Sequence, residues 1–212
     1  MSPTQPDGYL ATPAAGGGPP VLVLHAWWGL NQTIKGLCDR LAAEGFLALA
    51  PDLYHGEVAD TIEGAEKLGS ALDGNFKQAK AEIEEATRWL SERSGVASVA
   101  VLSFSLGVYY AVDLSTSNPD LVNSVVIFYG DASNDVSASQ AAYMGHFAEK
   151  DEFVSQEQVE ELESALQAAG RPVTFHTYPG TGHWFFEPDR EDAYDAAAAQ
   201  LAWERTLEFL KN

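Results

Sequence analysis

The stretch Val99-Ala-Val-Leu-Ser-Phe-Ser105-Leu-Gly107-Val-Tyr-Tyr-Ala111 has the pattern of an apolar strand, a tight turn centred on a serine, and an amphipathic helix. Such a turn strains the serine backbone, so the residues two positions before and after it must be small for strand and helix to pack closely. Those positions hold Ser103 and Gly107, which fits the Gly-x-Ser-x-Gly pattern except at its first glycine. The stretch predicts a nucleophile at Ser105, and an ordinary strand-to-helix turn is the alternative.

Apolar runs alternate with segments of helical period along the rest of the chain, which is typical of βα units. Strands are expected at Val21–His25, Phe46–Asp52, Val99–Ser103, Ser124–Tyr129, Tyr143–Ala148 and Val173–Tyr178. Helices are expected at about Gln32–Glu44, Asp60–Ser70, Phe76–Arg93, Leu106–Ser117, Ser155–Ala169 and Glu191–Leu210. The alternation predicts an α/β fold whose mostly parallel sheet is covered by helices on both faces, with ligands bound at the carboxyl ends of the strands.

Proline and glycine interrupt the first 20 residues so often that an irregular arm is expected at 1–20, with one short edge strand around Tyr9–Ala11. The remaining residues, 21–212, are expected to form a single domain, because 212 residues fall within the size of one domain and no repeat or linker divides them. The polar stretch Asp60–Asn75 is interpreted either as a mobile flap or as a plain surface helix.

Charge and cysteine content limit the partners of the chain. Thirty-one Asp and Glu residues against twelve Lys and Arg residues give a formal net charge of −19, which disfavours nucleic acid and anionic membranes and fits either a high-salt or an ordinary acidic protein. No apolar run approaches the ~20 residues of a membrane span and no signal-peptide pattern is present, so a cytoplasmic protein is expected. The single cysteine, Cys38, excludes an internal disulfide and is expected to be buried and unreactive.

A serine hydroxyl becomes a nucleophile only when a base accepts its proton, which calls for a histidine near Ser105. His146 and His176 each lie inside an apolar strand pattern, where structural histidines are common. His183 differs, because it follows the glycine-rich Tyr178-Pro-Gly-Thr-Gly182 after the last expected strand. This position at the carboxyl edge of the sheet predicts His183 as the base.

A carboxylate must also fix the tautomer of that histidine. Asp151 follows an expected strand and precedes an expected helix, with Glu149 and Glu152 as neighbouring rivals. The chain order Ser105, Asp151, His183 is that of α/β-hydrolases, in which each member follows a separate strand. The order therefore predicts Asp151 as the acid.

Acyl transfer also requires two backbone N–H donors for the oxyanion. One is expected at Leu106, directly after the serine and at a helix start, where negative charge is favoured. The other is expected at Trp27, in the loop after the first core strand. Trp27 and Trp28 also have an interpretation as packing residues, and one ring can pack while the other lines a pocket.

The chain resembles the dienelactone hydrolase family over nearly all of its length, through Val21–Leu30, Ala50-Pro-Asp-Leu-Tyr54, Ser103–Gly107, His146–Val154, Gly182–Phe186 and the final Ala202–Leu210 segment. The resemblance implies a minimal α/β-hydrolase, with no lid domain, that hydrolyses cyclic or small esters. It implies Ser105 as nucleophile, Asp151 as acid, His183 as base, and Trp27 and Leu106 as oxyanion donors. The expected serine mechanism requires no metal or organic cofactor.

Two departures from the family pattern change the expected substrate. Well-studied enzymes of this family use a cysteine nucleophile restrained by a glutamate, whereas this chain has Ser105 and, at the glutamate position, Ala26. They also hold a substrate carboxylate with arginines, whereas the residues from Trp184 to Glu187 are aromatic and acidic. A neutral, fairly apolar substrate is therefore expected. The expected pocket walls are Trp28, Tyr54, Trp184 and Phe185.

The leading interpretation is a serine carboxylesterase or lactonase that acts on a small-molecule ester or lactone, as a monomer or weak homodimer. A thioesterase or other acyl hydrolase fits the same three residues. A binding module that keeps the fold without the chemistry is the alternative from another class. The presence of nucleophile, base and acid together favours an enzyme.

Overall fold

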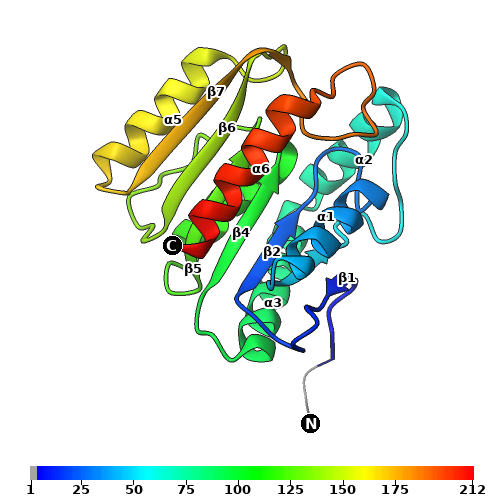
Figure 1. The fold of residues 1–212 in the computed structure, drawn as a ribbon, viewed down its shortest axis with the longest axis vertical. Helices are drawn as coiled ribbons and strands as arrows, with labels where there is room; N and C mark the ends of the chain where they lie inside the picture. The colour runs from blue at the N-terminus through cyan, green and yellow to red at the C-terminus, as the bar shows by residue number, and fades with distance from the viewer. Residues whose placement is uncertain (1–3) are drawn as a thin grey trace.

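The computed structural model describes residues 4–212 and contains a seven-stranded sheet in the order β1-β3-β2-β4-β5-β6-β7 (Figure 1). Strand β1 pairs antiparallel with β3, and the other neighbouring strands pair in parallel. The strands are β1 (Gly8–Ala11), β2 (Pro20–Leu24), β3 (Leu47–Pro51), β4 (Val99–Phe104), β5 (Val122–Phe128), β6 (Ala142–Lys150) and β7 (Val173–Gly182). This arrangement confirms the predicted α/β class.

Helices cover both faces of the sheet. They are α1 (Gln32–Ala43), α2 (Ile62–Gly74), α3 (Phe76–Ser94), α4 (Leu106–Ser117), α5 (Gln156–Ala168) and α6 (Ala196–Lys211). Two apolar clusters result from the alternation of side chains along each strand. In β2, Leu22 and Leu24 join the cluster that contains α3, α4 and α5, whereas Val21 and Val23 join the cluster that contains α1 and α6.

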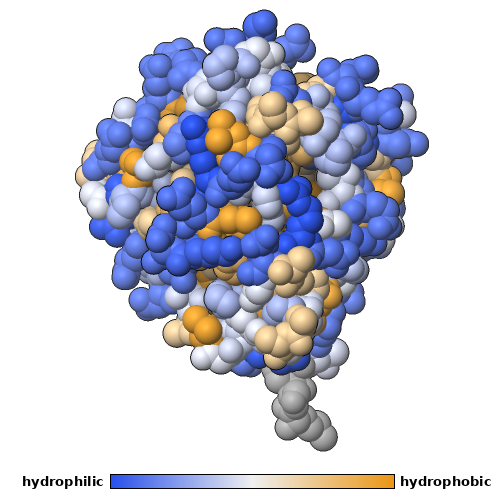
Figure 2. Space-filling view, viewed as in Figure 1, coloured by the Kyte–Doolittle hydropathy of each residue, from blue (hydrophilic) through white to orange (hydrophobic). Residues whose placement is uncertain are grey.

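Figure 1 shows α6 and α1 crossing the near face of the sheet, with α3 behind it. On this side of the molecule, hydrophilic residues dominate the surface and hydrophobic ones gather only in small separate patches (Figure 2). No helix in residues 4–212 is both long enough and apolar enough to cross a membrane.

The structure corrects two expected boundaries near the end of the chain. Residues Tyr178–Gly182, expected to be a loop, belong to β7, which stays paired with β6 up to the Lys150–Gly182 register after an irregularity at Ala148. Such an irregularity accommodates Pro179, which has no N–H to give to a ladder. Helix α6 begins at Ala196 rather than Glu191, because the Asp195 side chain caps it by accepting hydrogen bonds from the N–H groups of Ala197 and Ala198.

The stretch Asp60–Asn75 forms helix α2, which Thr61 caps through the N–H of Gly64. The helix approaches Trp27 so closely that a Cβ atom on Gly69 would lie 2.8 Å from the indole Nε1. A methyl group there would push the Trp27 ring out of its position, so glycine permits this close approach. Helix α2 therefore packs on the loop after β2, at the carboxyl edge of the sheet.

Candidate active site

Ser105 occupies the sharp turn between β4 and α4, with φ 46° and ψ −115°. Few L-residues adopt a positive φ, and such strain is typical of functional positions. The turn packs so closely on β2 that residue 107 must be glycine. A Cβ atom there would lie 2.8 Å from the Leu24 carbonyl oxygen and 2.9 Å from that of His25. Ser103 is fully buried and donates a hydrogen bond to the Val126 carbonyl. These contacts match the steric requirement that the sequence predicted.

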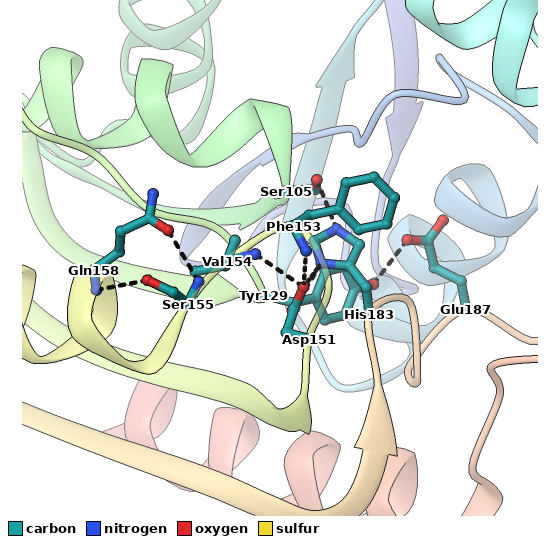
Figure 3. Close-up of polar contacts among 9 residues, drawn as sticks. All are labelled: Ser105, Tyr129, Asp151, Phe153, Val154, Ser155, Gln158, His183 and Glu187. Carbon is teal, nitrogen blue, oxygen red and sulfur yellow. Dashed lines mark hydrogen bonds and ion pairs between the residues drawn. The ribbon is translucent and has the colours of Figure 1, made fainter.

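Three side chains from separate strand ends form one hydrogen-bonded chain (Figure 3). The Oγ atom of Ser105 lies 2.9 Å from Nε2 of His183. On the other side of the ring, Nδ1 of His183 lies 2.8 Å from one carboxylate oxygen of Asp151 and 2.9 Å from the other. The side chains of His183 and Asp151 are each 4% exposed, so this contact is largely shielded from water.

The loop after β6 holds the Asp151 carboxylate in place. Its Oδ1 atom accepts hydrogen bonds from the N–H groups of Phe153 (2.9 Å) and Val154 (3.0 Å). The neighbouring carboxylates have other environments: Glu149 accepts the N–H of Gly180, and Glu152 is exposed. Of the three acidic candidates in this segment, the structure brings only Asp151 to His183.

A second polar pair lies behind the histidine. The Tyr129 hydroxyl donates a 2.8 Å hydrogen bond to Oε1 of Glu187, and the Tyr129 ring centroid lies 4.9 Å from that of His183. Burial raises the pKa of Glu187 to about 8, and the hydrogen bond from Tyr129 offsets only part of this increase. Burial and the neighbouring Glu187 also raise the pKa of Tyr129. A neutral, protonated pair therefore supports the inner face of the imidazole at neutral pH.

The backbone that carries Tyr129 is also strained, with φ 36° at Tyr129. The next residue, Gly130, packs so tightly that a Cβ atom there would lie 2.5 Å from Val108 Cγ2 and 2.6 Å from the Ser105 carbonyl oxygen. Sequence analysis did not single out either residue. The signal that could have found them is the Tyr-Gly pair directly after an expected core strand, at the edge where ligands bind.

A cavity of about 330 Å³ opens beside Ser105 and His183. Trp27 and Leu106, the expected oxyanion donors, both line it, as does Trp184. Sequence analysis missed several other lining residues, among them Asp73, Tyr109, Tyr110, Asp131 and Phe153. Tyr109 and Tyr110 could have been found, because they lie four and five positions after the serine, one turn into the helix.

Three of the four expected pocket walls do not line this cavity, and their assignment is corrected. Trp28 is 3% exposed and packs on the back of Trp184, with 5.1 Å between ring centroids. Tyr54 is buried against His25, and Phe185 is buried against Tyr129. Because neighbouring residues in a turn point in different directions, the sequence did not reveal which tryptophan faces the ligand space.

A second buried histidine makes structural contacts. His146 is fully buried, with Nδ1 2.8 Å from the Tyr178 hydroxyl and Nε2 3.0 Å from the Thr206 hydroxyl. Burial lowers the pKa of His146 well below its usual value, so the ring is neutral. Within residues 4–212, no group of three or more His, Cys, Asp or Glu side chains is placed to hold a metal ion.

The chain is similar to known proteins over nearly all of its length. The family model described as "Dienelactone hydrolase family" matches residues 7–212. A "Putative carboxymethylenebutenolidase" of Aquifex aeolicus is 35% identical, over 96% of this chain and 92% of that protein. The crystal structure of a "Putative Dienelactone Hydrolase" from Klebsiella pneumoniae is 27% identical with a TM-score of 0.83, over 97% of this chain and 92% of that one. A dienelactone hydrolase-like phosphotriesterase from metagenomic libraries, 20% identical with a TM-score of 0.84 over 96% and 91% of the two chains, shares the fold.

Proposed function

The chain belongs to the dienelactone hydrolase family, and from this membership we propose that it is a serine hydrolase of small ester or lactone bonds that uses Ser105, His183 and Asp151. The family and the names of the relatives indicate a hydrolase of the kind that acts on lactones and esters. The assignment of the reaction to Ser105, His183 and Asp151 goes beyond family membership. The observation that carries it is the 2.9 Å contact between Ser105 Oγ and His183 Nε2.

In the first half of the reaction, Oγ of Ser105 attacks the acyl carbon while Nε2 of His183 accepts the hydroxyl proton. Asp151 stabilises the imidazolium that forms and holds its Nδ1–H. The tetrahedral intermediate then collapses: the bond from carbon to the leaving oxygen breaks, and His183 returns its proton to that oxygen. The products of this half are an acyl-enzyme and an alcohol, which in a lactone remains joined to the acyl group.

Water completes the cycle by the same steps in the same order. His183 accepts a proton from water, the hydroxide attacks the acyl carbon, and Ser105 leaves with the proton that His183 gives back. The oxyanion of each intermediate accepts hydrogen bonds from the backbone N–H groups of Leu106 and Trp27, whose residues line the cavity beside the serine. The reaction consumes one water and requires no redox partner.

The lining of the cavity disfavours an anionic substrate. Over the described part of the chain, no lysine or arginine borders this cavity, whereas the aromatic rings of Trp27, Phe153 and Trp184 do. A substrate carboxylate would lose hydration without gaining a cationic partner, which is unfavourable. Small esters and lactones that carry no negative charge avoid this penalty.

A fluorophosphonate probe tests the proposal, because it adds covalently to an activated serine. We expect one adduct on the wild-type protein, located at Ser105, and none on Ser105→Ala. Hydrolysis of short-chain p-nitrophenyl esters should disappear in the same variant. A folded wild-type protein that stays unlabelled and hydrolyses esters no faster than Ser105→Ala would contradict the proposed function.

A further inference from the structure

The cavity beside Ser105 has acidic walls from two separate elements. Asp73 comes from the last turn of α2, and Asp131 follows β5. Asp131 accepts a 2.8 Å hydrogen bond from the Gln158 side chain, which is neutral and leaves the negative charge uncompensated. In residues 4–212, the lining contributes no cationic side chain, so both carboxylates give the cavity a negative potential.

Aromatic rings provide a second feature of the same cavity. Phe153 lies 6.0 Å from Trp27 and 5.0 Å from Trp184 between ring centroids, and all three residues line the space beside the serine together with Tyr109. The faces of such rings carry partial negative charge and attract organic cations. Phe153 and Tyr109 are partly exposed, at 45% and 40%, so a ligand can reach them.

Tyr110 adds an independent observation. It is 2% exposed and lines the cavity, and its hydroxyl has no hydrogen-bond partner among the described residues. Burial and then the charge of Asp73 raise the pKa of Tyr110 to about 12, so the phenol remains neutral. A buried polar atom without a partner costs free energy, and an ester oxygen of a bound substrate that accepts its O–H would recover that cost.

From these features we propose that the active-site cavity selects esters whose non-reacting end carries a compact organic cation, such as a trimethylammonium group. This inference depends on the proposed esterase function and names its substrate class. Carboxylates and ring faces attract the same cation, and the net charge of −19 draws cations toward the protein. Because Asp73 is exposed and Asp131 partly so, screening limits the preference to a moderate factor.

A pair of isosteric esters tests the charge alone. Butyrylcholine and 3,3-dimethylbutyl butyrate have the same shape, and differ in a quaternary nitrogen or a quaternary carbon. The measured quantity is the ratio of their kcat/KM values, each divided by the rate constant for hydroxide hydrolysis of that ester to remove intrinsic reactivity. At 50 mM salt we expect a ratio of about tenfold in favour of the cation, and a smaller ratio at 0.5 M salt.

Variants then assign the preference to the cavity. Asp73→Asn/Asp131→Asn should lower the ratio to within about twofold of unity, with each single variant in between. The matched control Asp120→Asn/Glu208→Gln removes two exposed carboxylates away from the cavity lining and should keep the wild-type ratio. Thermal melting establishes that each variant is folded. If the double variant is unfolded, either single variant replaces it in the comparison of ratios.

The outcomes separate this inference from the function on which it rests. Hydrolysis of both esters, lost in Ser105→Ala, with a ratio near unity overturns the cation preference and leaves the esterase intact. A ratio that falls equally in the cavity and control variants overturns the assignment to Asp73 and Asp131. If the protein hydrolyses neither these esters nor p-nitrophenyl esters, both proposals fail.

Discussion

The Tyr129 hydroxyl donates a 2.8 Å hydrogen bond to Oε1 of Glu187, and the ring of the same tyrosine lies 4.9 Å from His183. Burial raises the pKa of Glu187 from 4.5 to about 8. Because this folded-state pKa lies above the unfolded value, the folded protein retains a proton that the unfolded chain releases between pH 4.5 and 8. The contribution of Glu187 to stability is therefore present in acid and is lost as pH rises through this window.

Glu187→Gln removes that titration while keeping a carbonyl oxygen for Tyr129. We expect the free energy of unfolding of the wild type, minus that of the variant, to fall by up to about 1.4 kcal/mol per pH unit between pH 5 and 8. Urea unfolding at pH 5.5, 6.5 and 7.5 measures this difference, and subtraction cancels the titration of the other groups. A difference that is constant with pH would show that Glu187 is ionised in the folded protein.

Replacing Asp151 by asparagine tests the acid of the proposed triad. The amide oxygen can still accept the N–H groups of Phe153 and Val154, so the loop should keep its shape. The amide cannot stabilise an imidazolium and can offer an N–H to Nδ1, which favours the wrong tautomer of His183. We expect kcat for a p-nitrophenyl ester to fall roughly 10³- to 10⁴-fold with little change in KM.

The neighbouring exposed carboxylate provides the control for this experiment. Glu152→Gln removes the same charge from the adjacent position, and we expect its kcat to stay near the wild-type value. An equal loss in both variants would point to the general potential of the acidic loop rather than to the contact between Asp151 and His183.

Local steric rules explain why the tight turn at Ser105 could be predicted from the sequence. Ser103, Ser105 and Gly107 are constrained by the turn itself, and the structure gives Ser105 its positive φ and leaves no room beside Gly107. The continuation of β7 through Pro179 could not be predicted in this way. It depends on pairing with β6, a tertiary contact that local propensity does not encode.

The pocket lining shows the same division between local and tertiary information. Of the predicted pocket walls, Trp184 lines the cavity and Trp28, Tyr54 and Phe185 do not. Tyr109 and Phe153, which were not predicted, also line it. Which of two adjacent aromatic residues faces the ligand depends on how loops and helices pack on the sheet. The hydrogen bond from Tyr129 to Glu187 joins residues 58 positions apart, and nothing in the local sequence pairs them.

Gly107→Ala tests the packing of the turn between β4 and α4. The added methyl group would lie 2.8 Å and 2.9 Å from two backbone carbonyl oxygens, so strand and helix must separate. We expect a loss of about 1–3 kcal/mol in the free energy of unfolding and a large loss of esterase activity, measured by urea unfolding and by p-nitrophenyl ester hydrolysis.

Gly36→Ala is the matched control, because a Cβ atom there would meet nothing within 4 Å and Gly36 lies inside α1. This variant should gain about 0.5–1 kcal/mol, since alanine is the better helix former. Similar stability changes of the same sign in both variants would contradict the steric account of Gly107.

Cys38 offers a probe of unfolding that is independent of activity. Its side chain is fully buried in α1, and burial raises the pKa of the thiol to about 12. Only the thiolate reacts with iodoacetamide, so at pH 8 both the low thiolate fraction and the lack of access protect the native protein. We expect alkylation to follow urea concentration with the same midpoint as circular dichroism. Cys38→Ala should give no adduct at any urea concentration, and native wild-type protein that reacts as fast as a free thiol would contradict the burial of this residue.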